Sequence, residues 1–278
     1  MRVWFITGAS RGFGALITAE ALAAGDAVVA TAREPKSITD KFGEHPRLLA
    51  ARLDVTQEAQ AQAAVEAAIQ RFGRIDILVN NAGYGLLGAV EEANSRDVER
   101  VFATNVFGLL AVTRAVLPQM RRQRSGHVIN MSSLGGYGSY PGWGVYCATK
   151  FAVEGLTEAL AVEVAPLGIK ATIVEPGFFR TDFLDGQSLS VAEPISDYAD
   201  TAGATRTRAA ELNHAQPGDP ARLAKAILTL ADASKPPLRL PLGSDTLARI
   251  EAKNRGVAEE LASWRELSLS TDGVHAAN

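Results

Sequence analysis

Short apolar segments rich in β-branched residues recur along the chain, and longer segments with helical spacing separate them. The apolar segments cover residues 3–6, 27–32, 48–53, 75–79, 127–131, 169–174 and 238–242, and each is predicted to be a strand. The helical segments cover residues 14–24, 57–72, 97–122, 146–165 and 220–230. Because parallel strands need crossover connections, this alternation predicts an α/β fold with a doubly wound parallel sheet of about seven strands.

No proline- or glycine-rich linker interrupts the alternation, so residues 1–278 are expected to form a single domain. The pattern lapses between residues 178 and 218, where a long loop over a substrate site is expected. The loop should end where Asp219 caps a helix that has Pro220 at its first position. A C-terminal helical extension is expected over residues 244–264, with fraying after Trp264.

The bulk composition indicates a protein of metabolism. Twenty-eight basic and 31 acidic residues give a formal charge of -3, so no strong field should attract nucleic acid or an anionic membrane. Charged residues interrupt every apolar run well before it reaches membrane-spanning length, and no targeting segment is expected. The single cysteine, Cys147, excludes an internal disulfide and fits a reducing, cytoplasmic location. We expect a small-molecule partner and no metal site.

The segment TGASRGFG, residues 7–14, directly follows the first predicted strand. Its glycines, Gly8, Gly12 and Gly14, are spaced for a tight turn that meets a pyrophosphate at a helix N-terminus. The same segment matches the G-x-S-x-G nucleophile elbow of serine hydrolases, with Ser10 as nucleophile. That elbow needs an earlier strand and loop to supply an oxyanion donor, and only nine residues precede Ser10. A phosphate cradle is favoured over a hydrolase or a turn without a ligand.

The end of the second predicted strand bears on cofactor choice. An acidic residue there would bind the ribose hydroxyls of NAD, but the chain reads Ala-Thr-Ala-Arg over residues 30–33. Arg33 and Arg11 could both contact a 2'-phosphate through their planar donor arrays, although either could also be a solvated loop arginine. Their joint occurrence where the acid is missing favours NADP(H) over NAD(H).

Tyr146 and Lys150 are four residues apart on a predicted helix and therefore lie on one face. A fixed ammonium near a phenol favours the phenolate, so the pKa of Tyr146 is expected to fall toward neutrality. A tyrosine tuned in this way can give a proton to a carbonyl oxygen or take one from an alcohol. The strand before the pair leads into Ser133, at the carboxyl edge where such sheets bind ligands. Alone, a Tyr-x3-Lys pair is common on helix surfaces.

Taken together, these residues resemble the classical short-chain dehydrogenase/reductase family over roughly residues 2–242. The resemblance rests on the glycine motif and on a set of residues in the family's order: Asp54, Val55, residues 80–83 (Asn-Asn-Ala-Gly), Asn105, Ser133, Tyr146, Lys150, Pro176, Gly177 and Thr181. It implies a Rossmann-like sheet and hydride transfer between NAD(P) and a carbonyl or secondary alcohol. The C-terminal extension is more weakly similar to the hydroxysteroid and retinol dehydrogenase-like branch.

The resemblance also implies residue roles. Tyr146 would be the acid/base, Lys150 would lower its pKa and hold the nicotinamide ribose, Ser133 would position the substrate oxygen, and Asn105 would support a water relay to Lys150. The implied cofactor-binding residues are Gly8, Ser10, Arg11, Gly12, Phe13, Gly14, Arg33, Asp54, Val55, Asn81, Ala82, Gly83, Tyr146, Lys150, Pro176, Gly177, Phe179 and Thr181.

Apolar residues near the expected site predict the substrate pocket: Tyr84, Leu86, Leu134, Tyr137, Tyr140, Trp143, Phe178 and Phe183. They favour a bulky or aryl ketone, and a homodimer or homotetramer is expected through helices 97–122 and 146–165. A non-catalytic protein that senses NADP(H) is the alternative of another class, but it would not need Tyr146, Lys150, Ser133 and Asn105. The direction of the reaction follows cofactor ratios and cannot be derived from the sequence.

Overall fold

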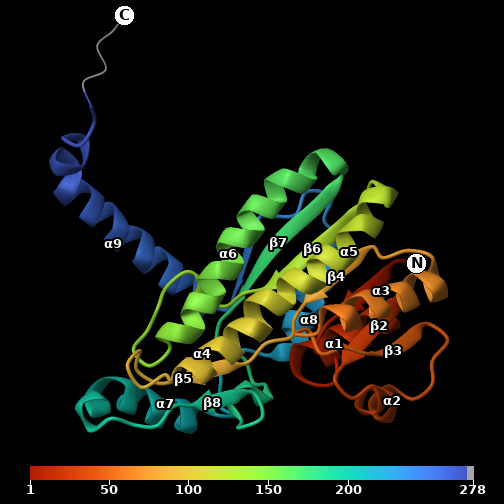
Figure 1. The fold of residues 1–278 in the computed structure, drawn as a ribbon, viewed down its shortest axis with the longest axis horizontal. Coiled ribbons are helices and arrows are strands. Elements are labelled where there is room, and N and C mark those ends of the chain that lie inside the picture. Colours follow the sequence, from red (N-terminus) through yellow and green to blue (C-terminus); the bar gives the residue numbers. More distant parts are fainter. Residues whose placement is uncertain (274–278) are drawn as a thin grey trace, which may run out of the picture.

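The computed structural model describes residues 1–273, and a seven-stranded sheet forms its centre (Figure 1). All neighbouring strands are parallel, in the order β3-β2-β1-β4-β6-β7-β9. The strands are β1 (Val3–Ile6), β2 (Ala27–Ala32), β3 (Leu48–Arg52), β4 (Ile77–Asn80), β6 (Gly126–Met131), β7 (Ile169–Pro176) and β9 (Arg239–Leu242). The predicted fold class and all seven predicted strands are confirmed. The strand order reverses beside β1, which is where such sheets open a crevice for a ligand.

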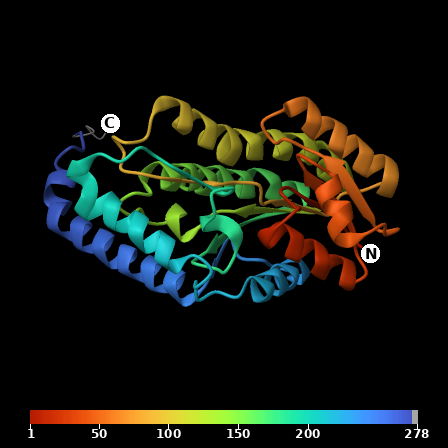
Figure 2. The ribbon, with the colours of Figure 1, turned by 90° about the horizontal axis from the view of Figure 1, so that it is seen from below.

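Helices cover both faces of the sheet (Figure 2). Helices α1 (Gly12–Ala23) and α8 (Pro220–Asp232) lie on one face, and α3 (Glu58–Phe72), α5 (Leu109–Gln123) and α6 (Gly144–Val164) lie on the other. Side chains of β1 alternate between the two cores, with Trp4 and Ile6 in the first and Val3 and Phe5 in the second. Burial on both faces explains why every residue of β1 is apolar.

One helix is long and apolar enough to resemble a membrane span. It runs from Ser95 to Gln123 with a mean hydropathy of 1.5 over the window, half of which is buried in the protein. It consists of α4 (Ser95–Phe102), a π-helical turn η1 (Ala103–Gly108) and α5. Val101, Val112 and Val116 are completely buried, and the two valines of α5 pack in the core between this helix and the sheet. Its place in the fold therefore accounts for its apolar character.

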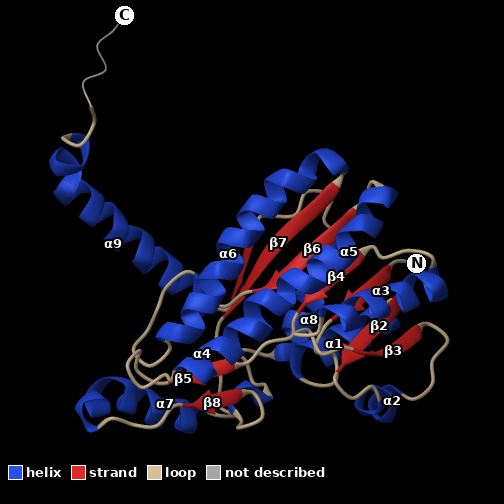
Figure 3. Cartoon of the chain, in the orientation of Figure 1, coloured by secondary structure: helices blue, strands red, loops and turns tan. Residues whose placement is uncertain are grey.

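Several short elements were not predicted from the sequence. The segment 178–218, expected as a loop, contains η4 (Asp182–Leu184), β8 (Leu189–Val191), η5 (Ser196–Tyr198), η6 (Ala199–Gly203) and α7 (Ala204–Leu212). Strand β8 pairs with β5 (Gly85–Leu87) in a small separate sheet (Figure 3). This pairing joins segments about a hundred residues apart, so local periodicity could not reveal it. Helix α2 (Lys36–Phe42) was also missed.

The C-terminal helix α9 spans Ser244–Leu269 and projects from the body of the protein (Figure 1). The predicted fraying after Trp264 is wrong, because the helix continues to Leu269. Its first turns contact the body, where Arg249 donates to the Ser139 carbonyl over 2.7 Å and Asp245 accepts from the Phe178 amide over 2.7 Å. The helix therefore braces both the turn after Ser133 and the start of the 178–218 segment.

Candidate active site

The glycine-rich turn between β1 and α1 has the geometry of an anion cradle. Gly8 and Gly12 have φ angles of +65° and +54°, which L side chains rarely adopt. Helix α1 begins at Gly12, and no side chain caps its first-turn amides. The Asn81 side chain donates to the carbonyls of Thr7 and Gly8 over 2.9 and 3.0 Å and so fixes the turn. Free amides and a positive helix end fit a pyrophosphate.

Gly14 is required by close packing. A Cβ at this position would lie 2.3 Å from the Gly8 carbonyl oxygen and 2.7 Å from Asn81 Nδ2. We expect Gly14→Ala to displace the cradle, destabilise the protein by about 1–3 kcal/mol and abolish dinucleotide binding. Thermal unfolding and fluorescence titration with NADPH measure both effects. Gly155→Ala is the matched control, because a Cβ there has no neighbour within 4 Å; equal losses in both variants would contradict the packing argument.

A cavity of about 1250 Å³ connects this cradle to the predicted catalytic residues. It lies at the carboxyl edge of the sheet, as predicted. The predicted residues that line it are Gly8, Ser10, Arg11, Gly12, Phe13, Arg33, Asp54, Val55, Asn81, Ala82, Gly83, Tyr84, Ser133, Leu134, Tyr140, Trp143, Tyr146, Lys150, Pro176, Gly177, Phe178, Phe179, Thr181 and Phe183. Gly14 and Asn105 do not line the cavity; Gly14 packs against Gly8, and Asn105 is hydrogen-bonded to the Tyr84 backbone.

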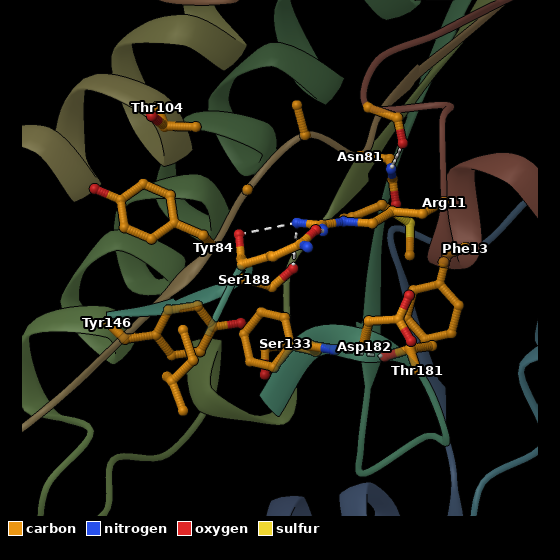
Figure 4. A pocket seen from close by; sticks show the side chains of 18 of the residues that line it. Arg11, Phe13, Asn81, Tyr84, Thr104, Ser133, Tyr146, Thr181, Asp182 and Ser188 are labelled. Atoms are coloured by element: carbon orange, nitrogen blue, oxygen red, sulfur yellow. Dashed lines mark hydrogen bonds between the residues drawn. The ribbon is translucent and has the colours of Figure 1, made fainter. Parts of the chain in front are cut away.

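Tyr146 and Ser133 lie side by side on one wall of the cavity (Figure 4), which Lys150 also lines. Tyr146 and Lys150 lie in the first two turns of α6, and Ser133 follows β6. The Lys150 ammonium donates to the Met131 carbonyl over 2.8 Å and lies 5.8 Å from the centre of the Tyr146 ring. Both side chains are buried, so a fixed phenol and a fixed ammonium face the cavity together.

The pKa of Tyr146 differs from the sequence expectation. Burial raises the pKa of Tyr146 above its ordinary value, and the hydrogen bond with Ser133 opposes this only in part. Burial also lowers the pKa of Lys150 to about 8, against the opposing charge of Glu154. The predicted fall in the tyrosine pKa is therefore wrong for this structure, because loss of solvent raises the pKa more than the hydrogen bond with Ser133 lowers it. Tyr146 is a neutral phenol here, which is the form that donates a proton.

Asn105 reaches the site through a local helix irregularity. It lies in the π-helical turn η1, and its amide nitrogen donates to the Tyr84 carbonyl over 3.0 Å and to Thr149 Oγ1 over 3.1 Å. Its Oδ1 accepts from the Tyr84 amide over 3.1 Å. A Cβ on Gly83 would lie 3.1 Å from that oxygen and 3.7 Å from Lys150 Nζ, so Asn105 and Lys150 are close neighbours. Wide turns of this kind often occur at functional sites.

The two arginines predicted at a 2'-phosphate differ in their contacts. Arg11 reaches across the cavity to the 178–218 segment (Figure 4), donating to the Gln187 side chain, to the Gln187 carbonyl over 2.9 Å and to Ser188 Oγ over 2.8 Å. Arg33 is exposed at the cavity rim, and it has no hydrogen bond or ion pair with any residue in 1–273. Arg33 therefore extends to the cavity rim without a partner among residues 1–273, whereas Arg11 is bonded to the 178–218 segment.

The predicted substrate pocket needs two corrections. Leu86 does not line the cavity, because its side chain is buried in the protein in β5. Tyr137 also lies outside the lining and donates to Asn254 on α9. Trp143, Tyr146 and Phe183 form an aromatic group with ring centres 5.6 to 6.5 Å apart. The structure adds lining residues that the sequence did not indicate: Asp182, Leu184, Gln187, Ser188, Leu189 and Val191.

Fold and site together define the class of protein: a doubly wound nucleotide-binding fold with a serine, a tyrosine and a lysine at its carboxyl edge. The short chain dehydrogenase family model matches residues 2–190. The chain belongs to this family and is an oxidoreductase. Similar proteins include Oxidoreductase BOA17 of Botryotinia fuckeliana, 40% identical over 97% of this chain and 99% of the relative. A second is the 3-ketodihydrosphingosine reductase of Bacteroides thetaiotaomicron, 41% identical over 87% of this chain and 88% of the relative.

Solved structures show the same architecture. A short-chain dehydrogenase from Streptomyces avermitilis superimposes with a TM-score of 0.91 and 44% identity, covering 98% of this chain and 100% of the other. A serine dehydrogenase complexed with NADP+ has a TM-score of 0.73 and 28% identity, covering 86% of this chain and 94% of the other. The family model ends at residue 190, whereas the similarity to the Streptomyces structure covers nearly the whole chain.

Proposed function

We propose that the protein transfers hydride between NADP(H) and an apolar ketone or secondary alcohol, with Tyr146 as the acid/base. The observation that carries this proposal is the joint placement of Ser133, Tyr146 and Lys150 on one wall of a cavity that also contains the glycine-rich cradle. A nicotinamide dinucleotide, such as the NADP+ in the solved serine dehydrogenase structure, would span the distance between the glycine-rich cradle and these three residues. The uncapped amides at Gly12 would hold its pyrophosphate, and Asp54 and Val55 its adenosine.

The roles of the residues follow from their protonation and contacts. The nicotinamide supplies the hydride for the carbonyl carbon. Tyr146, neutral because it is buried, donates its hydroxyl proton to the carbonyl oxygen, and Ser133 donates a hydrogen bond to the same oxygen. Lys150, fixed by the Met131 carbonyl over 2.8 Å, stabilises the phenolate that results. The reverse sequence oxidises an alcohol.

The cavity walls favour an apolar substrate of considerable size. Trp143 and Phe183 stack with ring centres 6.5 Å apart beside Tyr146, and Leu134, Leu184 and Leu189 extend the apolar surface. Aromatic walls bind flat or extended apolar groups through dispersion and burial. A bulky or aryl ketone fits this surface better than a charged sugar does.

A substrate panel tests this proposal. The protein is mixed with NADPH or NADH and with aryl ketones, steroid ketones, retinal, 3-oxoacyl thioesters and, because of the Bacteroides relative, 3-ketodihydrosphingosine. We expect loss of reduced-cofactor absorbance with at least one apolar ketone. Tight NADPH binding without consumption for any of them would instead support a sensor of NADP(H).

The preference for NADPH is assigned to Arg33. Since Arg33 is exposed and free at the rim, its replacement by alanine should raise the KM for NADPH about tenfold and leave the KM for NADH nearly unchanged. Initial rates with both cofactors measure this ratio. Lys41→Ala, which removes an exposed cation of α2 outside the cavity, is the control. An unchanged NADPH/NADH ratio in Arg33→Ala would contradict the assignment.

We also propose that the protein forms an oligomer through the helices 97–122 and 146–165, as the resemblance implied. Phe107 is 62% exposed beside α5, and Phe151 and Val162 of α6 are 45% and 77% exposed. Large apolar side chains exposed on neighbouring helices are typical of contact surfaces. Sedimentation equilibrium of the full chain, compared with Phe107→Glu, distinguishes a dimer or tetramer from a monomer.

A further inference from the structure

A buried group of acidic side chains lies directly behind the catalytic wall. Glu154 is one turn after Lys150 on α6, and Glu175 lies near the end of β7. Glu175 is 0% exposed and Glu154 is 6% exposed. A Cβ on Gly136 would lie 2.3 Å from Ser132 Oγ and 2.9 Å from Glu154 Oε1, so the turn that carries Ser133 packs onto this group. The acidic group therefore packs directly behind the turn that carries Ser133.

The charges in this group do not balance. Arg239 Nε on β9 lies 3.0 Å from Glu154 Oε2 and 3.9 Å from Glu175 Oε1, and the same guanidinium pairs with Glu158. Arg239 thus faces three carboxylates, and Lys150 lies one turn from Glu154, so two cations face Glu154, Glu175 and the half-exposed Glu158. Within residues 1–273, neither carboxyl oxygen of Glu175 has a conventional hydrogen-bond partner. A buried carboxylate without compensation is strongly unfavourable, so the group must retain a proton.

The groups that face this proton come from four elements. Helix α6 contributes Lys150, Glu154 and Glu158, β7 contributes Glu175, β9 contributes Arg239, and Ser132 follows β6. Burial and the charge of Glu154 raise the pKa of Glu175 to about 7. Burial also raises the pKa of Glu154, although Ser132 and Arg239 oppose this rise. Glu154 in turn raises the pKa of Lys150 and partly offsets the effect of burial.

We propose that Glu154 and Glu175 form a carboxyl pair that holds one proton and sets the charge of Lys150. Both are positioning residues, since neither lines the cavity. With the proton on Glu175, Glu154 keeps its negative charge one turn from Lys150 and stabilises the ammonium. When the pair loses this proton, a second negative charge stabilises the ammonium further. The role of the pair in turnover rests on the proposed function, whereas the shared proton does not.

The pH dependence of kcat/KM tests this proposal, with the sign set by the charges. Because burial lowers the pKa of Lys150 to about 8, loss of its charge should give the alkaline limb of the profile. Glu154→Gln removes the nearest negative charge, so the limb should move to lower pH by about one unit. Glu175→Gln fixes the neutral form and should give a smaller shift in the same direction. Glu163→Gln, which changes an exposed glutamate of α6 outside this group, is the matched control and should give no shift.

The outcomes separate this role from a structural one. In Glu154→Asp the alkaline limb should lie close to its original pH, because this substitution keeps the negative charge. Profiles of Glu154→Gln and Glu175→Gln that coincide with the unmodified protein would overturn the proposal. Equal shifts in all three glutamine variants, Glu163→Gln included, would also overturn it, since a general loss of charge would then explain them.

A second measurement requires neither turnover nor a substitution. In the intact protein labelled with 13C at glutamate carboxyl groups, one buried carboxyl should titrate near pH 7 by NMR. If every glutamate titrates in the ordinary range near pH 4, the proposal fails. If a resonance titrates near pH 7 but no carbonyl compound is reduced, the carboxyl pair stands and the proposed function fails.

Discussion

Replacement of Tyr146 by phenylalanine should lower kcat by about 10²–10⁴-fold, the range that a positioned general acid contributes. Only the hydroxyl is removed, so the ring contacts with Trp143 and Phe183, 5.6 Å between centres, should persist. NADPH affinity should stay within about twofold, because the cradle at Gly8 and Gly12 is untouched. Stopped-flow measurement of cofactor oxidation and fluorescence titration separate the two quantities.

Tyr84→Phe is the matched control for this variant. Tyr84 also lines the cavity, but it contacts Asn105 through its backbone, with the Asn105 side chain 3.0 Å from its carbonyl oxygen. Its hydroxyl has no part in the proposed proton transfer, so kcat should change little. A normal kcat in Tyr146→Phe, or an equal loss in Tyr84→Phe, would remove Tyr146 from its role.

Replacement of Lys150 by methionine should lower kcat by about 10²–10³-fold and also weaken NADPH binding. The ammonium donates to the Met131 carbonyl over 2.8 Å, and Lys150 is buried in the cavity wall. Methionine preserves the apolar stem but stabilises neither a phenolate nor a ribose hydroxyl. Steady-state kinetics should therefore show a fall in kcat together with a rise in the KM for NADPH, unlike the Tyr146→Phe pattern.

Lys170→Met is the control for the loss of a partly buried lysine. Lys170 donates to the Ala233 carbonyl over 3.0 Å from β7 and does not line the cavity. This variant should lower the unfolding temperature slightly and leave kcat unchanged. Unchanged NADPH binding in Lys150→Met would contradict the proposed contact with the cofactor.

The sequence predicted the sheet because local pattern and tertiary burial agree there. All residues of β1 and β2 are buried, and Thr31 is the one polar residue in these two strands. The glycine turn was predictable for a related reason, since backbone conformations such as that of Gly8 at φ +65° admit few other residues. Tyr146 and Lys150 followed from helix spacing, which places residues four apart on one face.

Features that depend on distant contacts were missed. The pairing of β5 with β8 joins Gly85 to Leu189 across the chain, and three-residue strands carry too little periodicity to be recognised. The bond between Arg11 and Ser188 depends on the same fold of the 178–218 segment. The raised pKa of Tyr146 arises from burial, which the sequence spacing of Tyr146 and Lys150 does not report. Short helices such as α2 and the π-turn at Asn105 have no distinct pattern.

The measurement that tests the account most directly follows a labelled hydride. NADPH carrying deuterium at both C4 positions of the nicotinamide is incubated with the protein and a ketone from the panel, and the product is examined by NMR and mass spectrometry. The account predicts one deuterium on the carbinol carbon and the loss of one deuterium from the cofactor. With Tyr146→Phe, labelled product should form about 10²–10⁴-fold more slowly. Bound NADPH that keeps its label with every carbonyl compound, or a Tyr146→Phe variant that transfers it at the normal rate, would contradict it.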